Sequence, residues 1–270
     1  MGCELVTGRY DEVHRPNRFE IVNWLGMRLI VVALFAPNLI WAQEEVSQQV
    51  WTNFIMAFPQ SDKLYYELDA ETAHQISGGE PWRYIYGTGM VEYYPSKLFD
   101  LTGELVVGVT DQDRLEDSFE VSTRWGFRTH FLNTIIDKYN RWEQFPSRKI
   151  GLANLMRLEQ RNFWYTSSRP SSHDWRWRNR VELRVAINKP DMATDGVWYL
   201  MADWEWFVPM SGQTSERFST KFRKRYGGGY RWRYKWRFEL LFQIDDARDT
   251  LADDFDVEAY MVDLRAKMFF

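Results

Sequence analysis

The chain has 270 residues and a formal net charge of −4, which excludes a global basic bias toward nucleic acid. Aromatic residues make up 17% of it, yet its mean hydropathy of −0.50 is too polar for a helical membrane protein. The single cysteine, Cys3, excludes disulfide staples and cysteine-ligated zinc. A chain that is rich in both aromatic and charged residues must place them on different faces of the same elements, which favours long amphipathic strands.

The N-terminal segment has the pattern of a secretory signal. Met27-Arg28 precedes the apolar run 29–36, and the small residue Ala42 stands before a polar segment. The run is shorter than the roughly 20 apolar residues that span a bilayer. We therefore expect cleavage after Ala42.

This expectation divides the chain in two. Residues 1–42 form an N-terminal extension and cleaved signal peptide, and residues 43–270 form one barrel domain. A buried core helix over 21–34 is the alternative, and the sequence leaves open whether translation starts at Met1 or Met27.

After this segment, hydrophobicity alternates with a period of two. From Trp175 to Ile187 every second residue is apolar except Asn179, and the residues between them are charged except Ala186. A strand places such charges on one side, whereas a helix scatters them around its circumference. Windows of this kind lie at 51–58, 63–71, 82–93, 98–110, 119–131, 150–164, 175–187, 197–208, 218–231, 235–245 and 258–270.

The lengths of strands and connections favour a membrane barrel. Several windows have 12 or more residues, whereas strands of soluble proteins usually have about 5–6. Short turns are expected on one side and longer loops on the other, as in outer-membrane barrels. The short connections are 59–62, 95–97 and 232–234; the longer ones are 72–81, 111–117, 166–173, 209–217 and 246–257.

The windows number eleven, but single-chain antiparallel barrels normally close with an even number of strands. We therefore predict an all-β, antiparallel, up-and-down transmembrane β-barrel of about 12 strands, with 10 as the alternative. The missing strand is expected near 43–50 or within 132–149, a segment otherwise interpreted as an irregular excursion. Short periplasmic turns and longer extracellular loops complete this prediction.

Aromatic residues gather near the expected strand ends, as Trp204, Trp206, Tyr230 and Trp236 illustrate. Trp and Tyr favour the boundary between membrane and water, where the ring is apolar and its N–H or O–H stays hydrated. A Trp-rich core of a soluble β-sandwich is the alternative. The pattern favours the outer membrane, with its lipid as a partner.

The charged faces of the strands are expected to line the interior of the barrel. Opposite charges that face each other across a narrow lumen pair and fill it; the alternative is an arginine-lined channel for small anionic solutes. The candidate network, or solute-binding set, consists of Arg157, Glu159, Arg161, Arg176, Arg178, Arg180, Glu182, Arg184, Asp203, Glu205, Lys221, Arg223, Arg225, Arg237 and Glu239.

The last window has an alternating apolar face that ends at the terminal aromatic residue. This pattern resembles the signal by which the barrel-assembly machinery recognises its clients, so that machinery is an expected partner during biogenesis. The expected signal consists of Tyr260, Val262, Leu264, Ala266, Met268 and Phe270.

Enzymatic activity is not expected. A hydrolase would need a nucleophile, a His base and an orienting group, and nothing in the pattern brings His74, His130 or His173 to such a site. No cofactor or metal is expected. An acidic run near the end of the chain is interpreted as a solvated loop, because it lacks the glycine-bearing spacing of a calcium loop. It comprises Asp245, Asp246, Asp249, Asp253 and Asp254.

The segment from about Val50 to Phe270 resembles a bacterial family that is catalogued as a domain of unknown function and treated as outer-membrane β-barrels. The resemblance implies a fold, but no catalytic residue and no cofactor. It rests on Val50-Trp51-Thr52-Asn53-Phe54, Tyr65 to Leu68, Val91-Glu92-Tyr93-Tyr94-Pro95, Arg157-Leu158-Glu159-Gln160-Arg161, Trp175-Arg176-Trp177-Arg178-Asn179-Arg180 and the terminal strand.

Overall fold

A computed structural model of the chain describes residues 46–270, apart from 62, 79–80, 97, 113–116, 132–148, 167–168, 191, 193, 212–219 and 249–253. The described residues all belong to one compact unit, Gln43–Phe270. The expected signal segment, its cleavage site after Ala42 and nearly all of 132–149 lie outside the described residues. Among the residues described, no helix is both long and apolar enough to cross a membrane.

Long strands account for most of the described chain. They coincide with the eleven windows of alternating hydrophobicity, because a period of two places apolar and charged side chains on opposite faces. The strands are β1 (Ser47–Pro59), β2 (Leu64–Ser77), β3 (Trp82–Tyr93), β4 (Phe99–Gln112), β5 (Ser118–His130), β6 (Ile150–Tyr165), β7 (Ser172–Ala186), β8 (Trp198–Pro209), β9 (Lys221–Trp232), β10 (Trp236–Ala247) and β11 (Asp256–Phe269).

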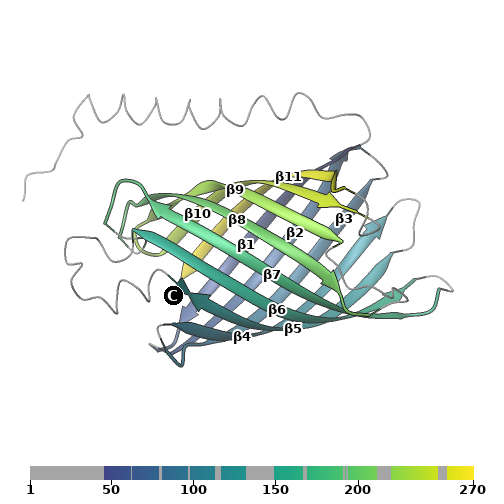
Figure 1. Cartoon of the computed structure of the whole chain (residues 1–270), viewed down its shortest axis with the longest axis horizontal. Coiled ribbons are helices and arrows are strands. Elements are labelled where there is room, and N and C mark those ends of the chain that lie inside the picture. Colours follow the sequence, from purple (N-terminus) through teal and green to yellow (C-terminus); the bar gives the residue numbers. More distant parts are fainter. Residues whose placement is uncertain are drawn as a thin grey trace, which may run out of the picture. The chain divides into compact units, whose positions relative to one another are not determined.

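The strands close into a single barrel in which each pairs with its neighbours in sequence (Figure 1). All of these pairs are antiparallel except the closing pair, in which β1 and β11 run parallel from Ser47 beside Ala259 to Ala57 beside Phe269. The prediction of 12 strands, or 10, was therefore wrong for the described residues, which form eleven. The parity rule holds only when the closing pair is antiparallel, and a parallel closing pair accommodates an odd number.

This closure also fixes where the strand ends lie. Because β1 and β11 run in the same direction, Ser47 and Phe269 lie at opposite ends of the barrel. We call these the N-terminal end and the C-terminal end. Connections 78–81, 113–117, 166–171, 210–220 and 248–255 lie at the N-terminal end, and connections 60–63, 94–98, 131–149, 187–197 and 233–235 lie at the C-terminal end.

The connections do not separate cleanly by length. The C-terminal end carries the three short turns that were expected there, but it also carries 131–149 and 187–197. The connection expected at 72–81 shortens to 78–81, because β2 continues as far as Ser77. The connection 187–197 between β7 and β8 agrees with the predicted windows 175–187 and 197–208, although it was not among the short or long connections expected.

The apolar faces of the strands point outward. Trp125, Leu105 and Leu240 are each about half exposed in the middle part of their strands. On the opposite face, Glu159 and Asp203 are completely buried. A soluble barrel has the reverse arrangement, whereas a barrel in lipid turns its apolar face outward and its polar face inward.

Outward-facing aromatic pairs lie near both ends of the barrel. Towards the N-terminal end, Trp206 of β8 stacks on Phe222 of β9, with ring centroids 5.1 Å apart. Towards the C-terminal end, Trp198 and Tyr230 of the same two strands lie 4.6 Å apart. Phe222 and Tyr230 are about 26 Å apart along β9. Because the strands of such barrels tilt by about 40° from the barrel axis, this corresponds to about 20 Å along the axis. This height is close to that of the apolar band of outer-membrane barrels.

Inside the barrel, one tyrosine reaches across a whole strand. The ring of Tyr86 in β3 lies over Gly108 in β4, and its hydroxyl donates to the Glu120 carboxylate in β5 at 2.6 Å. A side chain on Gly108 would overlap the Tyr86 ring. The glycine is therefore required by the close approach of this ring.

The same arrangement recurs on the other side of the barrel. Tyr199 of β8 lies over Gly229 of β9 and donates its hydroxyl to Glu239 of β10. Gly229 is the last of three consecutive glycines in β9, and the absence of a side chain there leaves room for the Tyr199 ring. Each tyrosine thus ties together three consecutive strands.

Candidate functional site

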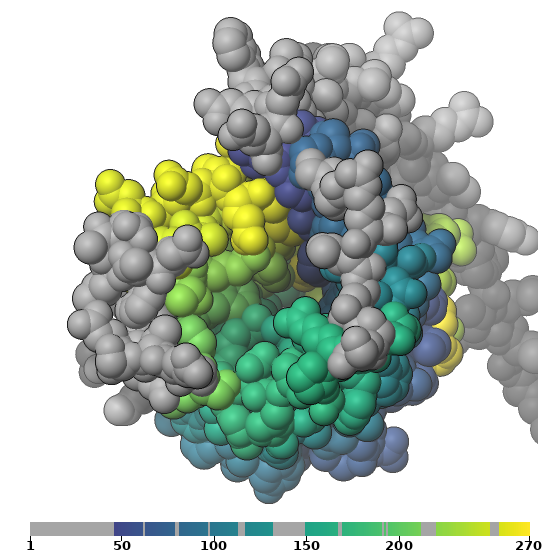
Figure 2. All heavy atoms as spheres, turned by 90° about the vertical axis from the view of Figure 1, so that its right-hand side faces the viewer, coloured from purple at the N-terminus to yellow at the C-terminus, as the bar shows by residue number. Residues whose placement is uncertain are grey.

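The interior of the barrel contains a cavity of about 770 Å³. Its lining extends along β3 from Trp82, the first residue of the strand, to Tyr94, just past its last. Figure 2 looks onto one end of the barrel and shows a hollow between the coloured strands. The cavity therefore follows the barrel from near one end to near the other.

Charged side chains dominate the wall of this cavity. Fourteen basic residues line it, against eight acidic ones. Behind them, six further inward-facing carboxylates are at most 4% exposed, and with the eight they balance the fourteen basic charges. The wall is thus neutral through its depth, while arginines dominate the surface that faces the cavity. The six are Asp100, Glu159, Asp203, Glu205, Asp245 and Asp263.

Glu159 of β6 is the most highly connected of these buried carboxylates. Its oxygens lie 2.5 Å from Arg176, 2.6 Å from Arg178, 3.4 Å from Arg124 and 4.0 Å from Arg157. β7 supplies two of these arginines from alternate positions, because β6 and β7 pair with Arg157 beside Arg178. Charge-assisted bonds of this kind offset part of the cost of removing a carboxylate from water.

A second chain of ion pairs continues through β8. Arg178 contacts Glu205 at 2.8 Å, so the same guanidinium joins Glu159 to Glu205. Arg225 of β9 donates to Asp203 at 2.9 Å. The predicted residues of β6, β7, β8 and β9 therefore meet in one network.

β10 and β11 extend the network. Arg184 pairs with Glu182 at 2.8 Å and approaches Glu239 at 3.8 Å. Glu239 also lies 3.4 Å from Arg237 and 3.9 Å from Arg265. Glu239 therefore has three basic neighbours, from β7, β10 and β11.

The acidic run near the end of the chain was only partly a loop. Asp245 and Asp246 belong to β10 and are buried. Asp245 faces inward and pairs with Arg223 at 2.8 Å and Lys221 at 3.0 Å. Asp246 pairs with Lys224 at 2.6 Å. The prediction of a solvated loop was wrong for these two residues, because β10 continues to Ala247; Asp254 is exposed, and Asp249 and Asp253 lie outside the described residues.

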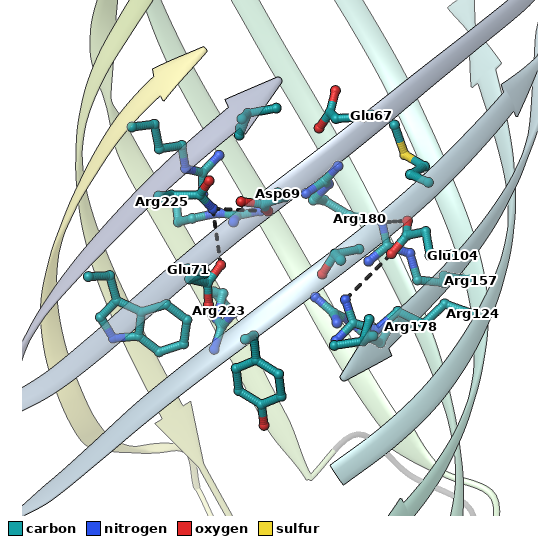
Figure 3. Close-up of a pocket in the computed structure, with 18 of the residues that line it drawn as sticks. Glu67, Asp69, Glu71, Glu104, Arg124, Arg157, Arg178, Arg180, Arg223 and Arg225 are labelled. Carbon is teal, nitrogen blue, oxygen red and sulfur yellow. Dashed lines mark hydrogen bonds and ion pairs between the residues drawn. The ribbon is translucent and has the colours of Figure 1, made fainter. Parts of the chain in front are cut away.

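Sequence reasoning missed an acidic wall. Glu67, Asp69 and Glu71 project into the cavity from alternate positions of β2, and Asn53 of the neighbouring β1 donates to Asp69 at 3.3 Å and to Glu71 at 3.1 Å (Figure 3). The signal was present as three acids at every second residue. The predicted strand ended at 71, and these three acids were not part of the predicted lumen set.

Other lumen residues outside the predicted set complete the pairing. Arg157 contacts Glu104 at 3.0 Å, and Arg161 contacts Glu120 at 2.9 Å. Lys267 of β11 bonds Glu67 of β2 across the closing seam of the barrel. Two of these three pairs, Arg157 with Glu104 and Lys267 with Glu67, join strands that are not consecutive in the sequence.

The histidines do not form a catalytic constellation among the described residues. His130 faces inward and lies 2.6 Å from Asp100 through its Nε2 atom. His173 lies on the outer face, where its Nδ1 contacts Asn162 at 2.7 Å. Across the described part of the chain, no group of three or more His, Cys, Asp or Glu side chains is arranged to hold a metal ion.

The terminal strand turns the expected assembly face outward. Leu264 is 45% exposed and Phe270 is 63% exposed, with Phe270 stacked on Phe58 of β1 at 4.8 Å. The inward row of the same strand carries Asp263 and Lys267. The outward row consists of Tyr260, Val262, Leu264, Ala266, Met268 and Phe270.

The fold and its interior define a closed β-barrel with an apolar outer face and a charged lumen. The chain belongs to the family described as protein of unknown function (DUF2490), whose model matches residues 48–252, and this confirms the resemblance found in the sequence. Among solved structures, the translocator domain of the autotransporter NalP from Neisseria meningitidis is similar, with 8% sequence identity, coverage of 84% of this chain and 91% of that chain, and a TM-score of 0.40. No curated protein matches the chain.

Proposed function

We propose that this protein is an outer-membrane β-barrel that encloses a narrow, water-filled passage for small solutes. The observation that carries the proposal is the cavity of about 770 Å³, which follows the barrel axis and is lined by charged side chains. Charges at this density need water or counterions, because each would otherwise be desolvated without full compensation.

The outer face supports placement in a membrane. Large apolar side chains are exposed along the strands, and aromatic pairs stand near both ends of the barrel. In water this surface would be an aggregation liability, whereas in lipid it is the solvated surface. Among Gram-negative membranes, the outer membrane is the one in which β-barrels reside.

The charge distribution supports a preference for anions. Arginine and lysine outnumber acidic residues along the cavity surface, and the six buried carboxylates lie behind them. A low-dielectric wall focuses the field of the exposed arginines into the lumen, which raises the local concentration of anions. Small anionic solutes therefore fit the passage better than cations of the same size.

A planar-bilayer experiment tests this proposal. Protein purified from outer membranes in detergent is added to one chamber, and the current is recorded in symmetric and then asymmetric KCl. Discrete conductance steps with a reversal potential of anionic sign are expected. Their absence in a protein that still shows a folded, heat-modifiable band on a gel would contradict the passage.

A sealed structural barrel is the second candidate, and Glu159 favours it. This carboxylate is completely buried among four arginines, as expected for a lumen filled by its own ion pairs. Neither candidate assigns catalysis to the chain, since His130 and His173 lie on opposite faces of the wall. The sealed structure predicts a folded, heat-modifiable barrel that gives no conductance steps in the planar bilayer.

The outward row of β11 is proposed as the recognition signal for the assembly machinery. Its alternate apolar residues end at the exposed ring of Phe270. Replacement of Phe270 by Ser is expected to lower the amount of folded barrel in the outer membrane without lowering synthesis. An unchanged ratio of folded barrel to total protein would remove this role from Phe270.

A further inference from the structure

The acidic wall of the lumen lacks basic partners at its centre. Asp69 and Glu71 accept hydrogen bonds from Asn53, and within the described residues neither has a basic nitrogen within 4.0 Å. One carboxylate oxygen of Asp69 is buried and accepts no hydrogen bond in the described structure. Two carboxyl groups thus face the cavity with only an amide between them.

Arginines on the far wall are also incompletely paired. Arg225 is only 5% exposed, and although its Nε donates to Asp203, its Nη2 makes no hydrogen bond to any described group. That Nη2 lies 4.0 Å from Glu205, beyond hydrogen-bonding range. Arg180 is similar, since Glu182, its closest described acid, is 4.0 Å away and its Nε has no partner among the described residues.

No ion pair among the described residues joins Asp69 or Glu71 to Arg180 or Arg225. Asp69 and Glu71 come from β2, whereas Arg180 comes from β7 and Arg225 from β9, and all four line the same cavity. Arg180 and Arg225 also repel each other, so each favours a negative group placed between them. Carboxyl and guanidinium groups with unfilled hydrogen-bonding capacity therefore face the same cavity, and each has capacity for a ligand.

We propose that the lumen binds small zwitterions, molecules that carry an ammonium group and a carboxylate or phosphate a few bonds apart. The ammonium donates to Asp69 and Glu71, and the anionic group accepts from Arg180 and Arg225. A simple anion leaves the acidic side unpaired, and a simple cation leaves the arginines unpaired. The proposal deepens the proposed function, because it rests on a lumen that solutes can enter.

The physical basis is that both charges of the ligand are compensated at once. Charge-assisted hydrogen bonds are roughly twice as strong as neutral ones, and arginine binds carboxylates and phosphates with a fixed fork of donors. A volume of about 770 Å³ falls within the roughly 300–1,000 Å³ typical of small-molecule sites. The site thus has space for both the ligand and its remaining water.

Three matched probes test the proposal: 4-aminobutyrate, butyrate and butylammonium. They share a four-carbon chain and differ in which charges they carry. Isothermal titration calorimetry is performed on the full-length chain expressed in a Gram-negative host and purified from its outer membrane, in a buffer without zwitterions. We expect 4-aminobutyrate to bind at least tenfold more tightly than either probe with a single charge.

Variants then assign each end of the ligand. Asp69→Asn combined with Glu71→Gln is expected to weaken 4-aminobutyrate at least tenfold while butyrate binds as well or better. Arg180→Gln is expected to weaken both 4-aminobutyrate and butyrate. Asp111→Asn and Arg83→Gln are the matched controls, because this ion pair is about half exposed at the rim of the barrel and away from the cavity.

Two outcomes overturn the proposal. Equal binding of butyrate and 4-aminobutyrate identifies a simple anion site, and no binding of any probe by a folded, heat-modifiable barrel shows that the ion pairs of the lumen are self-sufficient. Conductance of the same preparation separates this failure from that of the proposed function. A conducting barrel that binds none of the probes overturns the zwitterion site alone, whereas a silent one overturns both.

Discussion

At the scale of single residues, buried carboxylates act as fixed counterions for the arginines that face the lumen. Glu159 has no exposure to solvent and contacts four guanidinium groups. Removal of its charge leaves those arginines facing one another, with no compensating group at their centre. The wall therefore depends on Glu159 more than on any single arginine.

Replacement of Glu159 by Gln should cost about 3 kcal/mol of the free energy of unfolding, the lower range for breaking a buried ion pair. The measurement is the temperature at which the folded band disappears on an unheated gel. Asp111→Asn is the control, because its exposed ion pair with Arg83 is worth about 0–1 kcal/mol. Equal effects of the two variants would show that water, not the protein, compensates the Glu159 cluster.

Gly108 is expected to be intolerant of a methyl group. In Gly108→Ala, the new Cβ overlaps the Tyr86 ring and displaces its hydroxyl from Glu120, at a cost of about 1–3 kcal/mol. Gly103 in the same strand is the matched control, because a Cβ there meets no atom within 4 Å. If Gly108→Ala and Gly103→Ala have the same thermal stability, Tyr86 does not depend on the absence of a side chain.

At the scale of secondary-structure elements, alternation alone located all eleven strands. It failed at their ends: β2 extends to Ser77 and β10 to Ala247, where polar residues continue a strand that the pattern would stop. The reason is physical. Inside this barrel, polar side chains are the buried ones, so a polar residue does not signal the end of a strand.

The β9–β10 turn has a strained backbone. Arg233 has a φ of 51° and Tyr234 a φ of 56°, values that favour Asn and Gly over these residues. Arg233→Asn should raise the free energy of unfolding by about 1 kcal/mol, because Asn tolerates the left-handed region better. Urea unfolding followed by tryptophan fluorescence measures this, with Lys235→Asn as the control. If the free energy of unfolding rises in both variants, or in neither, Arg233 is not strained.

At the scale of the whole molecule, pairing across the lumen is what the sequence could not reveal. The arginines of β7 pair with acids of the predicted set on β6, β7, β8 and β10. Arg157 and Arg161 of β6 also pair with carboxylates of β4 and β5 that were not predicted. Lys267 and Glu67 are 200 positions apart and meet only because β11 closes on β1. The arginine side of the lumen was therefore predictable, and the acidic side contributed by β2 was not recognised.

The odd number of strands predicts that the two closing strands begin on one side of the membrane and end on the other. A membrane-impermeant maleimide should label single cysteines at Ser47 and Asp254 from the same side of the membrane. A single cysteine at Lys235 should be labelled only from the opposite side of the membrane. Cys3→Ser provides the background, since Cys3 is the one native cysteine. Reaction of Ser47→Cys together with Lys235→Cys would require an even-stranded closure.

β7 has one residue row that we expect to meet lipid and one that we expect to meet water. Arg180 faces the cavity and its neighbour Val181 belongs to the outward row. Single cysteines at these two positions, in the Cys3→Ser background and in lipid vesicles, are probed with a small water-soluble thiosulfonate and with a fluorophore quenched by brominated lipid. We expect Arg180→Cys to react with the thiosulfonate and its fluorophore not to be quenched, and we expect Val181→Cys not to react with the thiosulfonate and its fluorophore to be quenched. The reversed pattern would contradict this expectation.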